Sequence, residues 1–200
     1  MGTVLDGLTP ELKKWIEDQK VFFVATAPLT GDGHVNLSPK GGDAFRILDD
    51  DTVAYLDSTG SGNETSAHIL ENGRITFMWC AFDGPPRIFR LYGLGEVAVR
   101  GTERWDQLID HFTPDAGSRQ IIVLHIQRVQ SSCGFSVPFY EYVGDRDTLS
   151  RWAEKKGEAE VRKYQRRKNM RSIDGLETPI AQFFESGTFE DVESDAADDA

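Results

Sequence analysis

The first two thirds of the chain alternate short apolar runs with turn residues, a pattern typical of β-strands joined by tight connections. The β-branched and aromatic run 21–27 (VFFVATA) and the run 34–38 (HVNLS) are separated by the turn-forming residues TGDG, which predicts a hairpin. Similar runs predict further strands over 52–57, 74–82, 87–100 and 121–129. Within the longest of these runs, Gly93 and Gly95 predict a bend or a bulge.

Helical spacing of apolar residues marks the segments between and after these strands. Thr9 and Thr102 each precede such a segment and are predicted to cap a helix. A glycine-rich loop after residue 57 runs into a third helix, which Gly73 can end in the left-handed conformation. Beyond Gly144 the sequence predicts one or two helices, joined near Gly157.

Five or six strands with short turns, interrupted by two helices, favour an α+β fold over a parallel sheet. We predict a closed or nearly closed β-barrel of mainly antiparallel strands over residues 1–143. A helical extension packed on the barrel is expected over 144–186. The final segment, 187–200, is strongly acidic and poor in apolar residues, so we predict a disordered tail there.

The overall charge argues against a nucleic-acid partner. The chain has 200 residues, 39% of them hydrophobic, which suffices for one domain with a core. Its formal net charge is -11, whereas binding to phosphate backbones needs a surplus of Lys and Arg. The basic stretch 162–171 follows acidic residues and is typical of a solvated helix face.

Cysteine usage and hydropathy favour a cytoplasmic protein without a membrane partner. Cys80 and Cys133 lie far apart and are too few for a disulfide framework, which favours a reducing compartment. No apolar run approaches the ~20 residues of a membrane span, and the first residues lack the apolar centre of a secretion signal.

The spacing of the histidines, cysteines and serines gives little support for a metal site or a hydrolytic site. The histidines show neither HxH nor HxxxH spacing, and no cysteine pair accompanies them, so we predict no metal site. The motif GxSxG is absent. Phe77, Trp79 and Phe82 would suit stacking on a flat cofactor, but aromatic residues on an apolar strand more often belong to the core.

Three polar strings remain as candidates for ligand binding. In HVNLSPKGG, Ser38 and Lys40 precede a glycine pair that lets a ligand approach the backbone, although a plain surface turn would have the same composition. In TGSGNET, Asn63 and Thr65 lie at a helix start, where free amides favour an anion; simple capping is the alternative. The spacing of this string fits neither a Walker loop nor a dinucleotide fingerprint.

The third string is PPRIFRLYG, which contains two arginines on a predicted strand. Arg87 and Arg90 are three positions apart and are expected to point to opposite faces of that strand. At most one of them then lines a given pocket. An inward arginine would be a site candidate, because burying its charge unpaired is costly.

Together and in this order, the strings resemble the pyridoxamine 5'-phosphate oxidase-like superfamily of FMN-binding split barrels, over about residues 9–129. HVNLSPKG resembles the strand that reaches the flavin, YLDSTGSGNET the next strand and phosphate loop, and RIFRLYG the arginine-bearing strand. The segments SCGFSVPFYEYVGDRDTLSRW and KNMRSIDGLETP resemble an extension found in one uncharacterised branch. The implied fold is a split β-barrel with flanking helices.

The resemblance implies a homodimer in which each FMN touches both chains. It also implies a set of cofactor contacts, while it singles out no catalytic residue. The implied contacts are Ser38, Lys40, Tyr55, Asn63, Thr65 and Arg87. Lys40 and Arg87 would supply positive charge beside the phosphate or the reduced ring.

Two departures from the family pattern argue against vitamin B6 oxidation. The phosphate loop has Gly62-Asn63-Glu64 in place of a serine-arginine-lysine run, and Ile88 stands where the oxidases have glutamine. We therefore expect a flavin-dependent oxidoreductase acting on a different small organic substrate. The alternatives are a reductase that uses the deazaflavin F420, and a module that binds flavin or haem without turnover.

Overall fold

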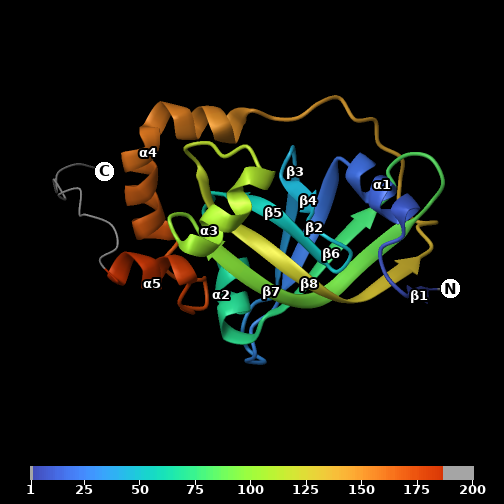
Figure 1. Ribbon diagram of the computed structural model, residues 1–200, viewed down its shortest axis with the longest axis horizontal. Helices are drawn as coiled ribbons and strands as arrows, with labels where there is room; N and C mark the ends of the chain where they lie inside the picture. Colours follow the sequence, from blue (N-terminus) through green and yellow to red (C-terminus); the bar gives the residue numbers. More distant parts are fainter. Residues whose placement is uncertain (1, 187–200) are drawn as a thin grey trace.

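The computed structural model describes residues 2–186, which form one curled antiparallel sheet with helices around it (Figure 1). The strands are β1 (Thr3–Leu5), β2 (Val21–Thr26), β3 (Asn36–Gly41), β4 (Phe45–Ile47), β5 (Thr52–Ser58), β6 (Arg74–Cys80), β7 (Ile88–Val99) and β8 (Ser118–Ser132). They pair in the order β3-β2-β6-β7-β8-β5-β4, with β1 added beside β8. The predicted α+β barrel of antiparallel strands is confirmed. The sequence analysis missed β1 and β4, because a strand of three residues is too short to show the alternation of apolar and polar positions.

The sheet is open between β3 and β4, which form the two ends of the strand order. Among the described residues these two strands do not pair with each other. The predicted hairpin is confirmed: β2 and β3 are antiparallel, with Val24 opposite Ser38. However, β3 runs on to Gly41, so Lys40 lies within the edge strand and not in a turn after it.

A bulge bends the long pair β7 and β8, as the glycines of β7 predicted. The register shifts between Tyr92 and Gly93. A Cβ atom at Gly93 would lie 1.9 Å from the carbonyl oxygen of His125, so no side chain fits there. This bend lets the two longest strands wrap around the core.

The helices begin and end largely where their caps predict. They are α1 (Pro10–Asp18), α2 (Glu64–Asn72), α3 (Glu103–Leu108), the short 3-10 helix η1 (Ile109–His111), α4 (Thr148–Lys168) and α5 (Pro179–Glu185). Thr9 and Thr102 accept backbone N–H groups of the first turn, and Gly73 ends α2 with a φ of 72°. Gly157, with a φ of 75°, interrupts α4 as predicted, whereas α5 was not predicted.

Alternating residues of the sheet feed two separate clusters of buried side chains. Ile122 and Leu124 of β8 face the barrel interior, where Phe77 and Trp79 also lie. Their neighbours on β8 face the other side of the sheet, against α3 and its Trp105. The interpretation of Phe77 and Trp79 as core residues is therefore confirmed.

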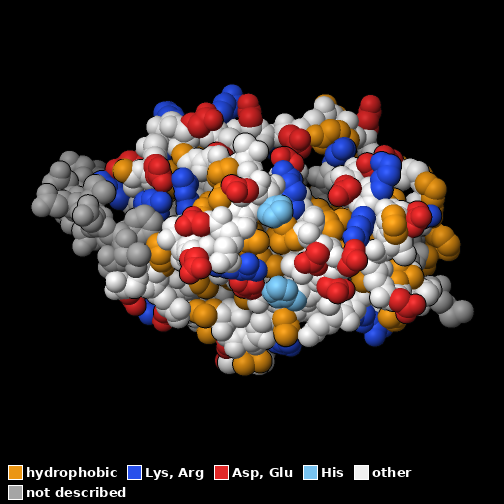
Figure 2. All heavy atoms as spheres, viewed as in Figure 1, with side chains coloured by type: hydrophobic (Ala, Val, Ile, Leu, Met, Phe, Trp, Pro, Cys, Tyr) orange, Lys and Arg blue, Asp and Glu red, His pale blue; other side chains and the backbone are white. Residues whose placement is uncertain are grey.

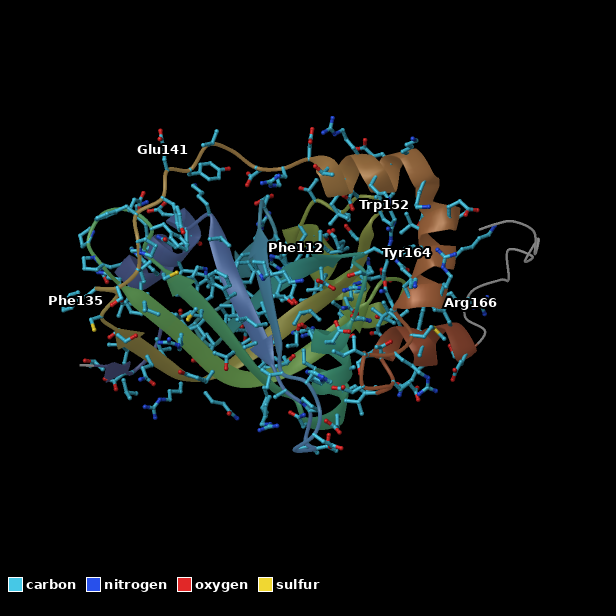
Figure 3. The ribbon with its side chains drawn as sticks, turned by 180° about the vertical axis from the view of Figure 1, so that it is seen from behind. Phe112, Phe135, Glu141, Trp152, Tyr164 and Arg166 are labelled. Atoms are coloured by element: carbon cyan, nitrogen blue, oxygen red, sulfur yellow. The ribbon has the colours of Figure 1, made fainter. Side chains whose placement is uncertain are left out.

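Between β8 and α4 the chain crosses outside the barrel as an arch segment, residues 133–147 (Figure 3). Within the described part of the chain, two of its N–H groups donate to backbone carbonyls: Val137 to Gly134, and Tyr140 to Phe82 of the β6–β7 connection. In Figure 3, Phe135 and Glu141 project away from the barrel. Large apolar side chains of this segment are exposed, namely Phe135, Phe139, Tyr140, Tyr142 and Val143.

Two features of the structure concern the expectations that the protein has no nucleic-acid partner and no membrane partner. Acidic and basic side chains are intermixed on the face shown in Figure 2, without one large basic patch. Within residues 2–186, no helix has both the length and the apolar character needed to cross a membrane. The predicted disordered tail, 187–200, lies outside the described residues.

Candidate functional site

Two neighbouring cavities open where the sheet is split, beside the edge strand β3. The larger, of about 980 Å³, lies between the β3–β4 connection and the arch segment. The smaller, of about 380 Å³, is lined by β3, the end of β5, the loop 60–63 and the start of α2. They share part of their lining, including Lys40, Leu56 and Leu149, so together they form a continuous recess.

A buried carboxylate fixes the cations of this recess. Asp57, at the end of β5, accepts hydrogen bonds from Lys40 Nζ, Arg119 Nε and Gln120 Nε2, each at 2.8 Å. Burial alone would raise the pKa of the Asp57 carboxyl, but the charges of Arg119 and Lys40 hold it well below its usual range. The ionised carboxylate therefore anchors both cations at the smaller cavity.

Among the described residues, the loop 60–63 between β5 and α2 has the carbonyls of Gly60 and Gly62 hydrogen-bonded and its amides unbonded. Asn169 Nδ2 donates to the oxygens of Gly60 and Gly62 at 3.0 and 3.5 Å, and Arg119 Nη1 donates to Gly62 at 2.9 Å. Among the described residues, none accepts a hydrogen bond from the N–H groups of residues 60–65. The first N–H groups of α2 are unpaired by helix geometry, so this wall of the cavity presents donors.

A chain of side-chain hydrogen bonds leads from the cavity to the barrel wall. Ser38 Oγ donates to Asn36 Oδ1 at 3.0 Å, and Asn36 Nδ2 contacts the hydroxyls of Thr26 and Thr65 at 3.2 and 2.9 Å. Thr26 Oγ1 also contacts Nδ1 of the buried His68 at 2.9 Å. These bonds orient the hydroxyls of Ser38 and Thr65 at the smaller cavity.

Glu64 lines the smaller cavity as well, and its carboxylate would repel an anion that it faced. The side chain turns back over Gly62, where a Cβ atom would lie 2.4 Å from Oε2. Its Oε1 accepts the backbone N–H of Ile173 at 3.3 Å. The carboxylate is thus engaged with the C-terminal extension.

Four of the six residues implied as cofactor contacts come together. Ser38, Lys40, Asn63 and Thr65 all line the smaller cavity. Tyr55 does not line either cavity, since it is fully buried beneath Lys40, whose Nζ lies 5.1 Å from the centre of its ring. Burial raises the pKa of this tyrosine well above its ordinary value.

Arg87 is not brought to the recess within one chain. It is exposed and lines neither cavity. Arg87 lies just before β7, which begins at Ile88, so the expectation that both arginines lie on one strand is wrong. Arg90, which is half-buried, donates to Ser132 Oγ at 3.1 Å.

Sequence analysis missed Arg119, Asp57 and the amide side chains of the extension. A charged residue within the apolar run of β5 was a usable signal for Asp57, since buried charges are rarely unpaired. The aromatic candidate Phe82 does line the larger cavity, where its ring lies 5.4 Å from that of Tyr140. Within the described residues no group of three or more His, Cys, Asp or Glu side chains is arranged to hold a metal ion.

Comparisons with known proteins agree with this architecture. The sequence model of one protein family, described as pyridoxamine 5'-phosphate oxidase, matches residues 8–133. The chain is 39% identical over 193 residues to the pyridoxamine 5'-phosphate oxidase family protein ustO of Aspergillus flavus, covering 88% of this chain and 77% of that protein.

Comparison with solved structures gives matches at low sequence identity. A variant of HupZ from Group A Streptococcus superposes with a TM-score of 0.50 and 22% identity, covering 62% of this chain and 99% of that one. A protein described as a candidate pyridoxamine 5'-phosphate oxidase from Lactobacillus delbrueckii gives a TM-score of 0.49 and 18% identity, with coverage of 63% and 97%. The family model ends at residue 133, where the arch segment begins, whereas the match to ustO covers 88% of the chain and therefore extends beyond that residue.

Proposed function

The chain belongs to the pyridoxamine 5'-phosphate oxidase family, and we propose that it is an FMN-binding oxidoreductase acting on a small organic substrate. The observation that carries the proposal is the wall of the smaller cavity. There, unbonded N–H groups of the loop 60–63 and of the first turn of α2 lie beside Lys40 and Arg119. Backbone donors at a helix start, together with two cations, suit the phosphate of FMN.

The larger cavity suits the flavin ring. Its volume lies in the range of small-molecule sites, and it continues directly from the smaller cavity. Phe82 and Tyr140 offer an aromatic wall, while Lys40, at the junction, provides positive charge. Bound FMN would supply hydride or electron transfer. The role of the chain is then to hold the phosphate, to neutralise charge near the ring and to shape the substrate space.

The proposal includes a homodimer with the flavin at the interface. The larger cavity is bounded on one side by the arch segment, which carries a row of exposed apolar side chains. Several large apolar side chains exposed on one segment suit an interaction surface. A second copy that covered it would enclose the cavity and bring its own Arg87 toward the flavin, which a single chain does not achieve.

Other cofactors are alternatives within the same recess. A deazaflavin also has a phosphate-bearing side chain, so the smaller cavity would serve it equally well. Haem is less well supported, because it needs an axial ligand such as histidine. Neither cavity has a histidine in its lining among the described residues, and His34, at a third cavity, is engaged with Asp174.

The test is an ultraviolet-visible spectrum of the purified protein before and after addition of FMN, with the released cofactor identified by mass. We expect the two visible bands of a flavin and about one FMN per chain. Bound flavin that is reduced by an added donor faster than free flavin would support turnover. One dominant visible band would indicate deazaflavin, and an intense Soret band would indicate haem; either would overturn the FMN assignment.

The location is also part of the proposal. Both cysteines are free, Cys80 buried and Cys133 exposed, which suits a reducing compartment such as the cytoplasm. No nucleic-acid or membrane partner is included in the proposal. The division into a barrel, 1–143, and an extension, 144–186, likewise stays a prediction.

A further inference from the structure

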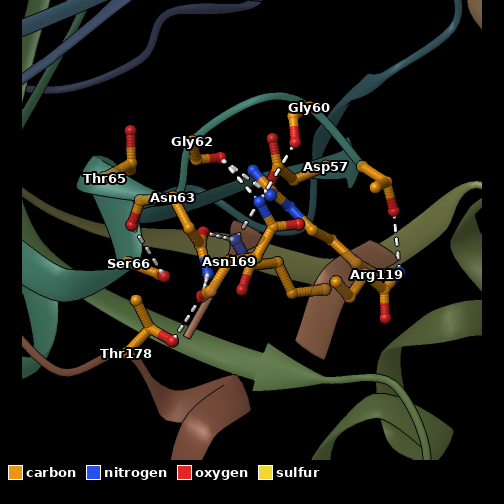
Figure 4. A network of polar contacts seen from close by, with 12 residues as sticks. Asp57, Gly60, Gly62, Asn63, Thr65, Ser66, Arg119, Asn169 and Thr178 are labelled. Carbon is orange, nitrogen blue, oxygen red and sulfur yellow. Dashed lines mark hydrogen bonds and ion pairs between the residues drawn. The ribbon is translucent and has the colours of Figure 1, made fainter. Parts of the chain in front are cut away.

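The C-terminal extension reaches into the loop that borders the smaller cavity (Figure 4). Gln165, near the end of α4, donates from Nε2 to Thr59 Oγ1 at 2.7 Å. Asn169, directly after α4, donates from Nδ2 to the oxygens of Gly60 and Gly62. Both side chains are buried, and Asn169 is completely so. Their partners are 106 and 109 positions earlier in the chain.

The backbone of Asn169 is held as firmly as its side chain. Its carbonyl oxygen accepts hydrogen bonds from Asn63 Nδ2 at 3.2 Å and from Thr178 Oγ1 at 2.8 Å. Asn63 Oδ1 in turn accepts from Gln120 Nε2 at 2.8 Å. The extension is therefore joined to both ends of the loop and, through Gln120, to the carboxylate of Asp57.

The hydrogen bonds from the Asn169 side chain to the loop backbone all have the same direction. The extension donates to carbonyl oxygens of the loop, and the N–H groups of residues 60–65 are left without an acceptor in the described part of the chain. A peptide group places its C=O and N–H on opposite sides. Holding the carbonyls against Asn169 therefore keeps the amides available on the side away from it.

We infer that Asn169, assisted by Gln165, is a positioning residue that makes the smaller cavity selective for a phosphorylated flavin. This inference rests on the proposed function. If the carbonyls of Gly60 and Gly62 turned into the cavity, their negative ends would face the phosphate and repel it. The residues responsible lie outside the stretch that matches the family model, which ends at residue 133. In this chain the extension thus completes a cofactor site that the barrel alone does not fix.

The burial of Asn169 supports a role beyond filling space. Its Oδ1 is buried and makes no hydrogen bond. A buried polar atom without a partner opposes folding, so an apolar residue would serve better if packing were the only demand. What asparagine offers here is the Nδ2 group that bonds the two glycine carbonyls.

The experiment compares FMN with riboflavin, which lacks the phosphate, by fluorescence titration of the full-length chain. Asn169→Ala is expected to weaken FMN binding about tenfold, the effect of losing roughly 1.4 kcal/mol of hydrogen bonding, and to leave riboflavin binding within about twofold. Gln165→Leu should act in the same direction if Asn169→Ala does not fold. Gln182→Ala, an exposed position on the same extension, is the control and should change neither affinity.

A second readout needs no flavin. Hydrogen exchange of the Thr59 and Ala67 amides, which donate to Gly117 and Asn63 at the two ends of the loop, should be faster in Asn169→Ala than in wild type and unchanged in Gln182→Ala. Equal weakening of both flavins, or unchanged exchange of these two amides, would overturn the positioning role. Wild-type protein that binds neither flavin would instead reject the proposed function, and the exchange result would still decide whether Asn169 holds the loop.

Discussion

Arg119 Nε lies 2.8 Å from Oδ2 of Asp57, and the two side chains are only 6% and 3% exposed. The pair joins β8 to the end of β5 at the floor of the smaller cavity. Because the same carboxylate also accepts from Lys40, one negative charge positions two positive ones. The arrangement leaves a net positive charge at the place where we propose that the phosphate of FMN binds.

Removing this carboxylate should destabilise the protein. Asp57→Asn would leave two cations without their buried partner, a loss of about 3–5 kcal/mol in the free energy of unfolding. Chemical denaturation followed by circular dichroism measures it. Asp18→Asn, which affects an exposed ion pair with Lys14, is the control and should cost less than about 1 kcal/mol. Equal stability of the two variants would contradict the anchoring role of Asp57.

The same carboxylate predicts a pH dependence. Its pKa is lower in the folded protein than the ordinary value of 3.8, so its stabilising effect is complete above that value and is lost as the pH falls below it. Wild type should lose about 1 kcal/mol more than Asp57→Asn between pH 6 and pH 3. Denaturation curves of both proteins at the two pH values measure the difference. Equal losses of stability in the two proteins would mean that the pKa of Asp57 is not lowered in the folded protein.

The two cations should matter for cofactor affinity. Lys40→Ala and Arg119→Ala are each expected to weaken FMN binding by about 1 to 3 kcal/mol, because each removes a charge-assisted contact. Lys14→Ala, on the exposed side of α1, provides a matched loss of charge and should leave affinity unchanged. Isothermal titration with FMN gives the affinities. If both site variants bound FMN as wild type does, the phosphate would not lie in the smaller cavity.

Arg87 offers a test of the dimer. Within one chain it is exposed and lies outside both cavities, so Arg87→Ala can weaken FMN binding only if a second copy brings it to the site. We expect a loss of about 1 to 3 kcal/mol, together with a dimer in light scattering after size exclusion. A monomer whose FMN affinity is unaffected by Arg87→Ala would reject the interfacial site.

Local sequence signals predicted most of the barrel. They missed the residues whose positions depend on pairing between distant parts of the chain. The caps at Thr9 and Thr102, the left-handed Gly73 and the hairpin turn each depend on a few neighbouring residues, which explains their success. Arg119 was missed because it precedes the apolar run 121–129, and only pairing with β5 extends that strand back to Ser118. The contacts of Asn169 with the loop 60–63 span more than 100 positions, so no local period could reveal them.

The contact between His34 and Asp174 joins the β2–β3 connection to the extension. His34 Nδ1 lies 2.6 Å from Asp174 Oδ1, and its backbone N–H donates to Oδ2. The hydrogen bond to Asp174 raises the pKa of His34, so this contact stabilises the fold below the ordinary pKa of 6.5 and weakens as the pH rises through the raised value. An NMR titration should show a lower His34 pKa in Asp174→Asn than in wild type. An unchanged titration would mean that the pair does not form in solution, and Asp106→Asn is the distant control.

The bulge at Gly93 should tolerate no side chain. A Cβ atom there would meet the carbonyl oxygen of His125, which is backbone of the neighbouring strand and cannot rotate away. Gly93→Ala must therefore spread β7 from β8, and we expect a loss of more than about 2 kcal/mol in the free energy of unfolding. Gly31→Ala is the matched control, because nothing lies within 4 Å of its Cβ position. Thermal unfolding of both variants measures the effect. Similar melting temperatures would show that the register shift at this bulge is not required for the barrel to close around its core.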